Sequence, residues 1–166
     1  MLNIGSCDLP LPKPWINIDN STSPHIKADL VMDGRELDKH FNANSVDEIY
    51  AAHFLEHLTP EEGNNFIKMC VKLLKPGGRL TIVTPDMRKI AELYLVGDIT
   101  IDELNQTYIF SYVQESLHKS CYDINRLTDV FTNNGLTSIT EIDRMGYELL
   151  AYPAIWQCGV TAIKRS

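Results

Sequence analysis

The order of secondary structure is clearest in residues 73–84, which read Leu73-Leu74-Lys75-Pro76-Gly77-Gly78-Arg79-Leu80-Thr81-Ile82-Val83-Thr84. A helix is predicted to stop at Lys75-Pro76, because proline has no amide to continue it and two glycines follow. Residues 79–84 are rich in apolar and β-branched side chains and predict a strand. A helix that leads directly into a strand is typical of a parallel α/β sheet.

The helix before this turn is predicted to begin at Thr59. Thr59-Pro60-Glu61-Glu62 offers a capping hydroxyl, a proline in the first turn and two acids on the helix dipole. Apolar side chains then recur at three- and four-residue intervals, at Phe66, Met69, Cys70, Leu73 and Leu74. This spacing predicts an amphipathic helix.

Strands and helices alternate through most of the chain. Further strands are predicted at 2–5, 15–19, 28–32, 46–52, 137–143 and 154–163. The last two strands are close in sequence and are therefore expected to pair antiparallel. Helices are predicted within 87–118, broken near Gly97-Asp98, and from Leu127 to Asn133.

The predicted fold class is thus α/β, with a Rossmann-like, mostly parallel sheet and a C-terminal antiparallel hairpin. The first two connections, residues 6–14 and 20–27, are shorter than the roughly dozen residues of a helical crossover. Helices are therefore expected mainly on one face. We expect a single domain over 1–166, with 87–118 inserted as a helical lid.

The composition is that of a globular domain. Of the 166 residues, 44% are hydrophobic and 22% charged, which excludes a disordered tail, a collagen-like rod and a disulfide-rich miniprotein. The net charge of −7 argues against nucleic acid as a partner, and no apolar run is long enough to cross a bilayer. The four cysteines are scattered and the first residues do not resemble a secretion signal, so we expect a cytoplasmic location.

Ligands of an open parallel sheet bind beyond the carboxyl ends of its strands. In this chain those ends carry glycine, acidic and histidine residues: Gly5-Ser6, Asp19, Asp33-Gly34 and His53-Phe54-Leu55-Glu56-His57. Glycine allows close approach of a ligand to the backbone, and a lone carboxylate after the second strand suits the two hydroxyls of a ribose. Each residue could instead be an ordinary turn residue.

The sequence as a whole resembles the class I S-adenosylmethionine-dependent methyltransferases. The resemblance rests on Leu2–Cys7 as the first glycine motif, Ile18-Asp19, residues 49–58 with Leu55-Glu56-His57, and residues 73–80. Late in the chain, residues 118–136 resemble a subgroup of small methyltransferases. The first motif departs from the family pattern, because it has one glycine and no helix after it.

The resemblance implies S-adenosylmethionine as cofactor and S-adenosylhomocysteine as product. Gly5 and Ser6 would face the methionine part, and Asp19 would hold the ribose hydroxyls. Asp33 and the amide of Gly34 would meet the adenine. His53 would lie under the sulfonium. The resemblance also implies a small-molecule or saccharide acceptor.

Methyl transfer requires positioning, and a base where the acceptor loses a proton. The candidate bases are His53, His118 and Asp86. The sequence pattern does not indicate which of them acts. His57 is the weaker candidate, since it is expected to hold the start of the following helix.

Two other functions fit parts of the sequence. His53-Phe54-Leu55-Glu56-His57 matches H-x-x-E-H, the pattern of a zinc hydrolase. The pattern needs a helix, whereas His53 is expected to close a strand, so we expect no metal ion. A non-catalytic binding protein on the same fold is the more serious alternative, because fold alone does not establish activity.

The short connections also bear on assembly. A parallel sheet is normally covered on both faces, and a bare face would expose apolar surface. Either the segment 87–118 folds back over this face or a second subunit covers it. Because the lid is expected at the carboxyl edge, we expect a homodimer.

Overall fold

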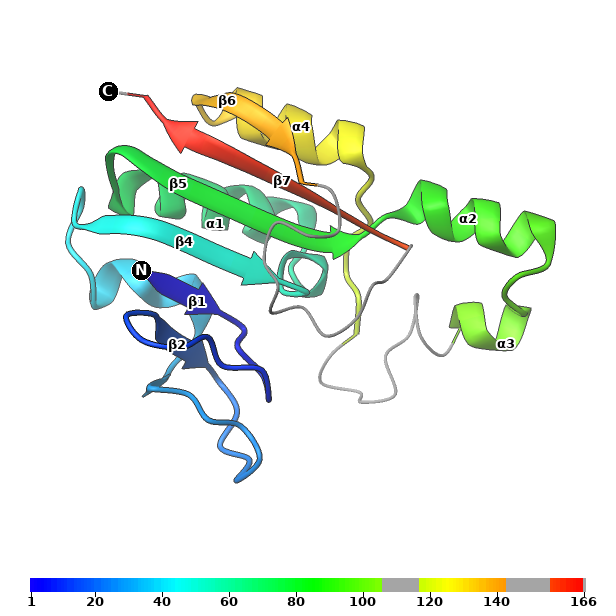
Figure 1. Ribbon diagram of the computed structural model, residues 1–166, viewed down its shortest axis with the longest axis horizontal. Helices are drawn as coiled ribbons and strands as arrows, with labels where there is room; N and C mark the ends of the chain where they lie inside the picture. The colour runs from blue at the N-terminus through cyan, green and yellow to red at the C-terminus, as the bar shows by residue number, and fades with distance from the viewer. Residues whose placement is uncertain (106–116, 143–155, 166) are drawn as a thin grey trace.

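The structure is a computed structural model that describes residues 1–105, 117–142 and 156–165. The described strands form one seven-stranded sheet in the order β3-β2-β1-β4-β5-β7-β6 (Figure 1). They are β1 (Leu2–Ile4), β2 (Ile16–Asp19), β3 (Leu30–Val31), β4 (Val46–Ala52), β5 (Leu74–Pro85), β6 (Leu136–Glu141) and β7 (Gln157–Lys164). The first five strands are parallel, and β7 runs antiparallel to both β5 and β6. The predicted fold class is confirmed.

The helices are α1 (Pro60–Leu73), α2 (Met87–Val96), α3 (Ile101–Glu103) and α4 (Ile124–Asn133), with 3-10 turns η1 (Gly34–Lys39) and η2 (Leu55–His57). Figure 1 shows α1 and α4 on the same face of the sheet. Their apolar side chains pack on the inward side chains of β1, β4, β5 and β7 in one core. None of the described helices is both long and apolar enough to span a membrane.

The helix α1 begins where the sequence predicts. The amide of Glu62 donates to the Thr59 hydroxyl at 3.3 Å, and the amide of Thr59 donates to the Glu62 carboxylate at 2.9 Å. These two bonds form a capping box. The strand after α1 starts earlier than predicted, since Leu74 already pairs with Val46. Residues 75–78 then loop out before Arg79 resumes the pairing opposite β4.

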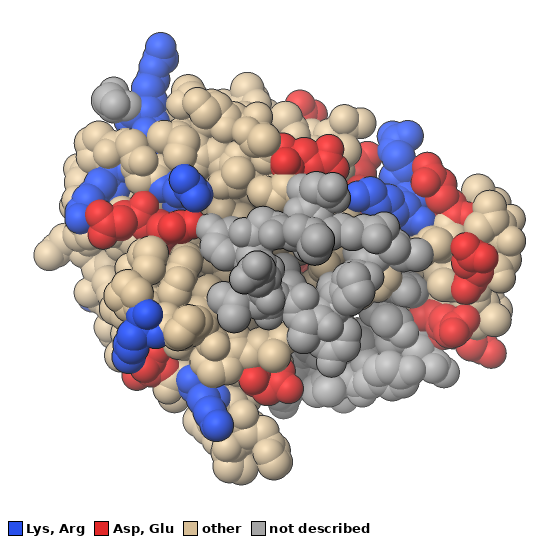
Figure 2. Space-filling view, in the orientation of Figure 1, with Lys and Arg blue, Asp and Glu red and all other residues tan. Residues whose placement is uncertain are grey.

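The face of the sheet opposite α1 and α4 is partly polar. The side-chain amide of Asn3 donates to that of Asn17 at 2.9 Å, and both residues are buried. Thr81 and Thr161 share a hydrogen bond of 3.0 Å across β5 and β7. On the side of the molecule in view, Figure 2 shows Lys and Arg side chains spread out among the described residues rather than gathered in one patch.

The loop between β1 and β2 covers part of this face, in place of the helix that this connection lacks. Leu11 and Trp15 from the β1–β2 connection pack on Tyr50 of β4. Asn17 holds the loop, because its side chain accepts from the Leu11 amide at 2.8 Å and donates to the Leu11 carbonyl at 3.0 Å. This loop buries part of the face from which a homodimer was expected. The homodimer stays a prediction.

Part of the predicted lid lies outside the described residues. Within 87–118, the structure shows α2 and α3, and Gly97 ends α2 with a left-handed φ of 84°. Figure 1 shows α2 extending beyond the carboxyl edge of the parallel strands. Residues 106–116 are not described, so the lid over an acceptor stays a prediction. The predicted last strands, 137–143 and 154–163, correspond to β6 and β7, with 143–155 also outside the description.

Candidate functional site

The candidate site lies where the strand order reverses. The strand β1 pairs with β2 on one side and with β4 on the other. The carboxyl ends of these strands carry Gly5, Asp19 and His53. Gly5 has a φ of 67°, and a Cβ added there would lie 3.3 Å from the Phe54 ring. Glycine thus lets the end of β1 approach the end of β4, at the edge where α/β sheets bind ligands.

Ser6 carries a polar atom that is not satisfied. The amides of Gly5 and Ser6 both donate to the Ile18 carbonyl, at 2.9 and 3.1 Å. The Ser6 side chain is buried, and its hydroxyl has no hydrogen-bond partner among the described residues. A buried hydroxyl without a partner is costly, so a ligand group that reached this atom would gain a hydrogen bond with it.

Asp19 links the ends of β1 and β2. One carboxylate oxygen accepts from the Cys7 amide and the other from the Ser21 amide, both at 2.9 Å. Each carboxylate oxygen can accept about two hydrogen bonds, so both retain capacity. Asp19 is therefore held in place by the backbone and still able to receive two hydroxyl donors.

Asp33 bonds to a neighbouring side chain in this structure, and its predicted adenine contact stays a prediction. Its carboxylate accepts from the Arg35 amide at 2.8 Å and pairs with the Arg35 guanidinium at 2.6 Å. Arg35 also contacts Glu62 of α1 at 2.8 Å. The hydrogen bonds from Arg35 hold the pKa of Asp33 below its usual range. Gly34 is packed so tightly that an added Cβ would lie 2.8 Å from the Phe54 ring.

His53 closes β4 in a left-handed conformation with φ 52°. Its Nδ1 lies 3.1 Å from Glu56 Oε1, and its Nε2 lies 2.8 Å from Gln157 Oε1. The Trp156 ring lies 5.3 Å from the imidazole, centroid to centroid. The Glu56 side chain is only 2% exposed, and its other oxygen accepts from the Thr84 hydroxyl at 3.2 Å.

The charges of His53 and Glu56 support each other. Burial alone would lower the pKa of His53, but the hydrogen bond and charge of Glu56 outweigh it and raise this pKa. Burial would raise the pKa of Glu56, whereas the hydrogen bond and charge of His53 hold it below its usual value. Both neighbours of the ring present oxygen, which favours the imidazolium.

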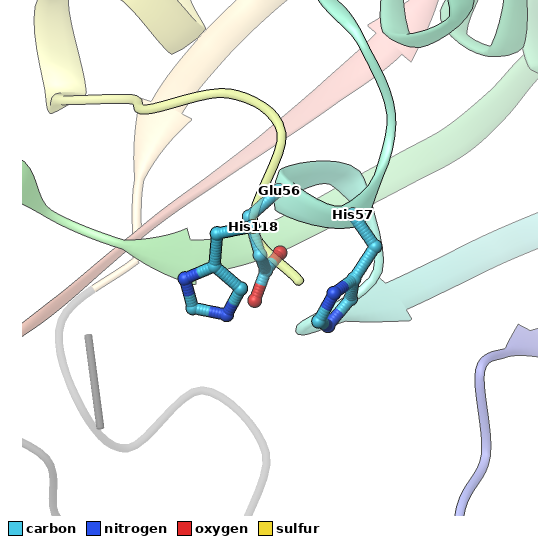
Figure 3. Close-up of side chains that lie close together, drawn as sticks. All are labelled: Glu56, His57 and His118. Atoms are coloured by element: carbon cyan, nitrogen blue, oxygen red, sulfur yellow. The ribbon is translucent and has the colours of Figure 1, made fainter. Parts of the chain in front are cut away.

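Glu56, His57 and His118 form a cluster at the same edge (Figure 3). Their ligand-type atoms all lie within 4.8 Å of one another, and the two imidazole rings meet edge to face at 4.9 Å. The approach of His118 follows from the backbone, because the amides of Lys119 and Ser120 donate to the Glu56 carbonyl at 2.8 and 3.2 Å. Sequence reasoning named both histidines but did not bring them together.

The zinc-hydrolase pattern does not have the helix that it requires. Residues 55–57 form a 3-10 turn, and His53 precedes it at the end of β4. His53 bonds to Glu56 instead of lying beside His57 on one helix face. The cluster of possible ligands therefore contains His118 in place of His53.

Asp86 is a structural cap and not an exposed base. It is 1% exposed, and its carboxylate accepts from the amides of Arg88 at 3.0 Å and Lys89 at 3.3 Å at the start of α2. A small pocket lies beside it at the end of β5. The pocket is lined by Glu56, Pro85, Met87, Ile90, His118, Ser120, Cys121 and Tyr122. Of the candidate bases, His118 lines this pocket.

Comparison with known proteins agrees with this geometry. The methyltransferase domain family matches residues 16–82, which run from β2 into β5 and make up less than half of the chain. The chain is similar to a SAM-dependent methyltransferase from Archaeoglobus fulgidus, with 15% identity, a TM-score of 0.67, and coverage of 98% of this chain and 85% of that one. A SAM-dependent methyltransferase from Thermotoga maritima gives 13% identity and a TM-score of 0.68, covering 99% and 81%.

A third similar structure is the 1,6-didemethyltoxoflavin-N1-methyltransferase of Burkholderia thailandensis, with bound S-adenosylhomocysteine. It has 13% identity and a TM-score of 0.61, covering 99% of this chain and 70% of that one. Comparison with curated protein sequences finds no match. The sheet order and the site at its switch point define the class I methyltransferase fold. With the family match over residues 16–82, these similarities show that the chain has the fold of the S-adenosylmethionine-dependent methyltransferases.

Proposed function

We propose that this protein transfers a methyl group from S-adenosylmethionine to a small-molecule or saccharide acceptor at the carboxyl edge of the sheet. The observation that carries the proposal is the pair formed by the unpartnered Ser6 hydroxyl and the Asp19 carboxylate. They stand at the ends of two adjacent strands, beside the point where the strand order reverses. The proposal also includes a cytoplasmic location and a homodimer, and both stay predictions.

The residues at this edge fit the cofactor. Asp19 would accept the two ribose hydroxyls with the capacity that its backbone contacts leave. Gly5 would admit the methionine part close to the backbone, and Ser6 would gain the hydrogen bond that it lacks. The Asp33 carboxylate is already occupied by Arg35, so the proposal assigns it to holding the turn after β3.

The cofactor supplies a methyl group on a positively charged sulfur, and S-adenosylhomocysteine is the product. The protein then has to hold the acceptor in line and to manage its proton. Asp86 caps α2 and His53 faces two oxygens, which leaves proton removal to the neighbourhood of Glu56, His57 and His118.

Binding and turnover test the proposal in two steps. Calorimetric titration with S-adenosylmethionine should show one site per chain, and Asp19→Asn should weaken it at least tenfold because both ribose hydroxyls lose an anionic acceptor. Asp8→Asn, on the exposed loop after β1, is the matched control and should bind like the wild type. No binding by the wild type, or equal binding by Asp19→Asn, would contradict the site.

A panel of acceptors should then be screened for formation of S-adenosylhomocysteine. A non-catalytic binding protein is the second candidate, favoured by the occupied Asp33 and the single glycine after β1. It would bind S-adenosylmethionine with the same dependence on Asp19 and form no product with any acceptor.

A further inference from the structure

We propose that Glu56, His57 and His118 bind a divalent first-row metal ion at the carboxyl edge of the sheet. The three residues offer a carboxylate and two imidazoles whose ligand atoms lie within 4.8 Å of one another (Figure 3). Two histidines and one carboxylate are a common ligand set for such ions, and they leave coordination positions open. The sequence alone gave no reason to expect this group, since His118 lies far along the chain from Glu56.

The carboxylate is held as a ligand should be. Glu56 is 2% exposed, and its two oxygens contact His53 at 3.1 Å and the Thr84 hydroxyl at 3.2 Å. These contacts fix the direction of the carboxylate, as the outer partners of a ligand do in known metal sites. A carboxylate buried to this extent is also favoured by a nearby positive charge.

The histidines have matching support. His57 Nδ1 lies 3.4 Å from the Leu117 carbonyl, which can only accept. If Nδ1 donates to this carbonyl, Nε2 carries the lone pair that a metal ion needs. His118 is brought to the cluster by its own segment, since the next two amides bond to the Glu56 carbonyl.

The spacing is close to that of a bound ion. Ligand atoms about 2.0–2.2 Å from a tetrahedral ion are roughly 3.4 Å apart, so the widest separation has to close by about 1.4 Å at most. His57 and His118 are both half-buried. Their imidazole rings can turn about the side-chain torsions, whereas Glu56 stays fixed.

The metal site would deepen the proposed function by naming the acceptor class, and on this point it rests on that proposal. Glu56 and His118 line the pocket at the end of β5. An acceptor hydroxyl bound to the ion would lose its proton more readily, because the metal stabilises the oxyanion. The O–H bond breaks with the proton passing to water, the oxygen bonds to the methyl carbon, and the sulfur keeps the electron pair of the broken S–CH₃ bond. The acceptor would then be a hydroxyl-bearing molecule.

Metal binding tests the site without any turnover. Protein freed of metal by a chelator should be titrated with Zn²⁺ by calorimetry and with Co²⁺ by visible absorption. We expect one ion per chain, and at least a tenfold loss of affinity in His57→Ala and in His118→Ala. The matched controls are His25→Ala and His40→Ala, since both histidines are exposed and outside the cluster. They should bind like the wild type.

The outcomes separate the two proposals. No stoichiometric binding by the wild type, or affinity within twofold of it in both cluster variants, overturns the metal site. The melting curves of the metal-free proteins show whether the variants fold, and His57→Asn and His118→Asn replace any alanine variant that does not. Titration with S-adenosylmethionine is the independent measurement: its failure in the wild type overturns the proposed function, whereas its success beside absent metal binding overturns only the metal site.

Discussion

Replacing Ser6 by alanine should separate ligand binding from folding. The Ser6 hydroxyl is buried and has no partner among the described residues, so its removal breaks no hydrogen bond there. Leaving such a group unpaired costs about 1–3 kcal/mol, and its loss should therefore leave the protein equally stable or slightly more stable. For a chain of this size, a gain of about 1 kcal/mol raises the melting temperature by roughly 2–4 °C.

The same substitution should weaken binding of S-adenosylmethionine. A hydrogen bond contributes about 0.5–1.5 kcal/mol, which corresponds to roughly a two- to tenfold increase in Kd. Calorimetric titration measures the Kd and a thermal melt measures the stability. Ser45→Ala is the control. The Ser45 hydroxyl lies outside the site and donates a hydrogen bond of 2.7 Å to the Asn42 carbonyl. A Kd for Ser6→Ala equal to that of the wild type would refute the role given to this hydroxyl. A fall of several degrees in its melting temperature would show that the hydroxyl is paired.

Three further substitutions test the fold. Asn17→Ala should lower the free energy of unfolding by about 2–4 kcal/mol in urea, because the buried Asn3 amide and the Leu11 backbone lose their partner; a loss under 1 kcal/mol would contradict this. Gly34→Ala should cost about 1–3 kcal/mol in the same assay, since the new methyl group would press on the side chains of Ile4 and Phe54; wild-type stability would show that both side chains move aside freely. The hydrogen bond from the backbone amide of Asn17 is the main reason why the pKa of Asp29 is lowered to about 2. The Asp29 carboxylate therefore stabilises the fold above pH about 4, and this contribution is lost as the pH falls toward 2. Asp29→Asn should thus be less stable than the wild type at pH 6, with the difference vanishing near pH 2; a constant difference would contradict the lowered pKa.

The fold could be predicted because its signals are local. The strand at 46–52 was predicted at its observed bounds. The start of α1 was predicted because its cap Thr59, the proline and the acids lie within four residues. The polarity of the uncovered face was also present in the sequence, since Asn3 and Asn17 alternate with apolar residues in their strands. The absence of helices on a face therefore does not by itself predict an apolar surface there.

The contacts at the site were harder to predict. A sequence pattern does not distinguish an acid that binds a ligand from one that caps a helical turn, and it does not show contacts between distant segments. Asp33 and Asp86 stand at strand ends like ligand-binding acids, but each binds an amide two residues later and begins a helical turn. The meeting of Glu56 with His118 is the opposite case, since no short pattern signals a contact made across the fold. Gln157 was missed for the same reason, although it bonds to His53.

The turn at residues 53–56 has a consequence for the order of folding. The Glu56 carbonyl in this turn accepts hydrogen bonds from the segment 117–120. His53 bonds to Gln157 at the start of β7, which lies 104 positions further along the chain. Closing such long loops is entropically costly, so these contacts should form after β1, β2 and β4 have paired. The ends of β1 and β2 that carry Ser6 and Asp19 need neither segment. Refolding should therefore restore the ends of β1 and β2, and with them the proposed binding of the cofactor, before the pocket at the end of β5 is complete. Stopped-flow measurements would then see the two events as separate phases.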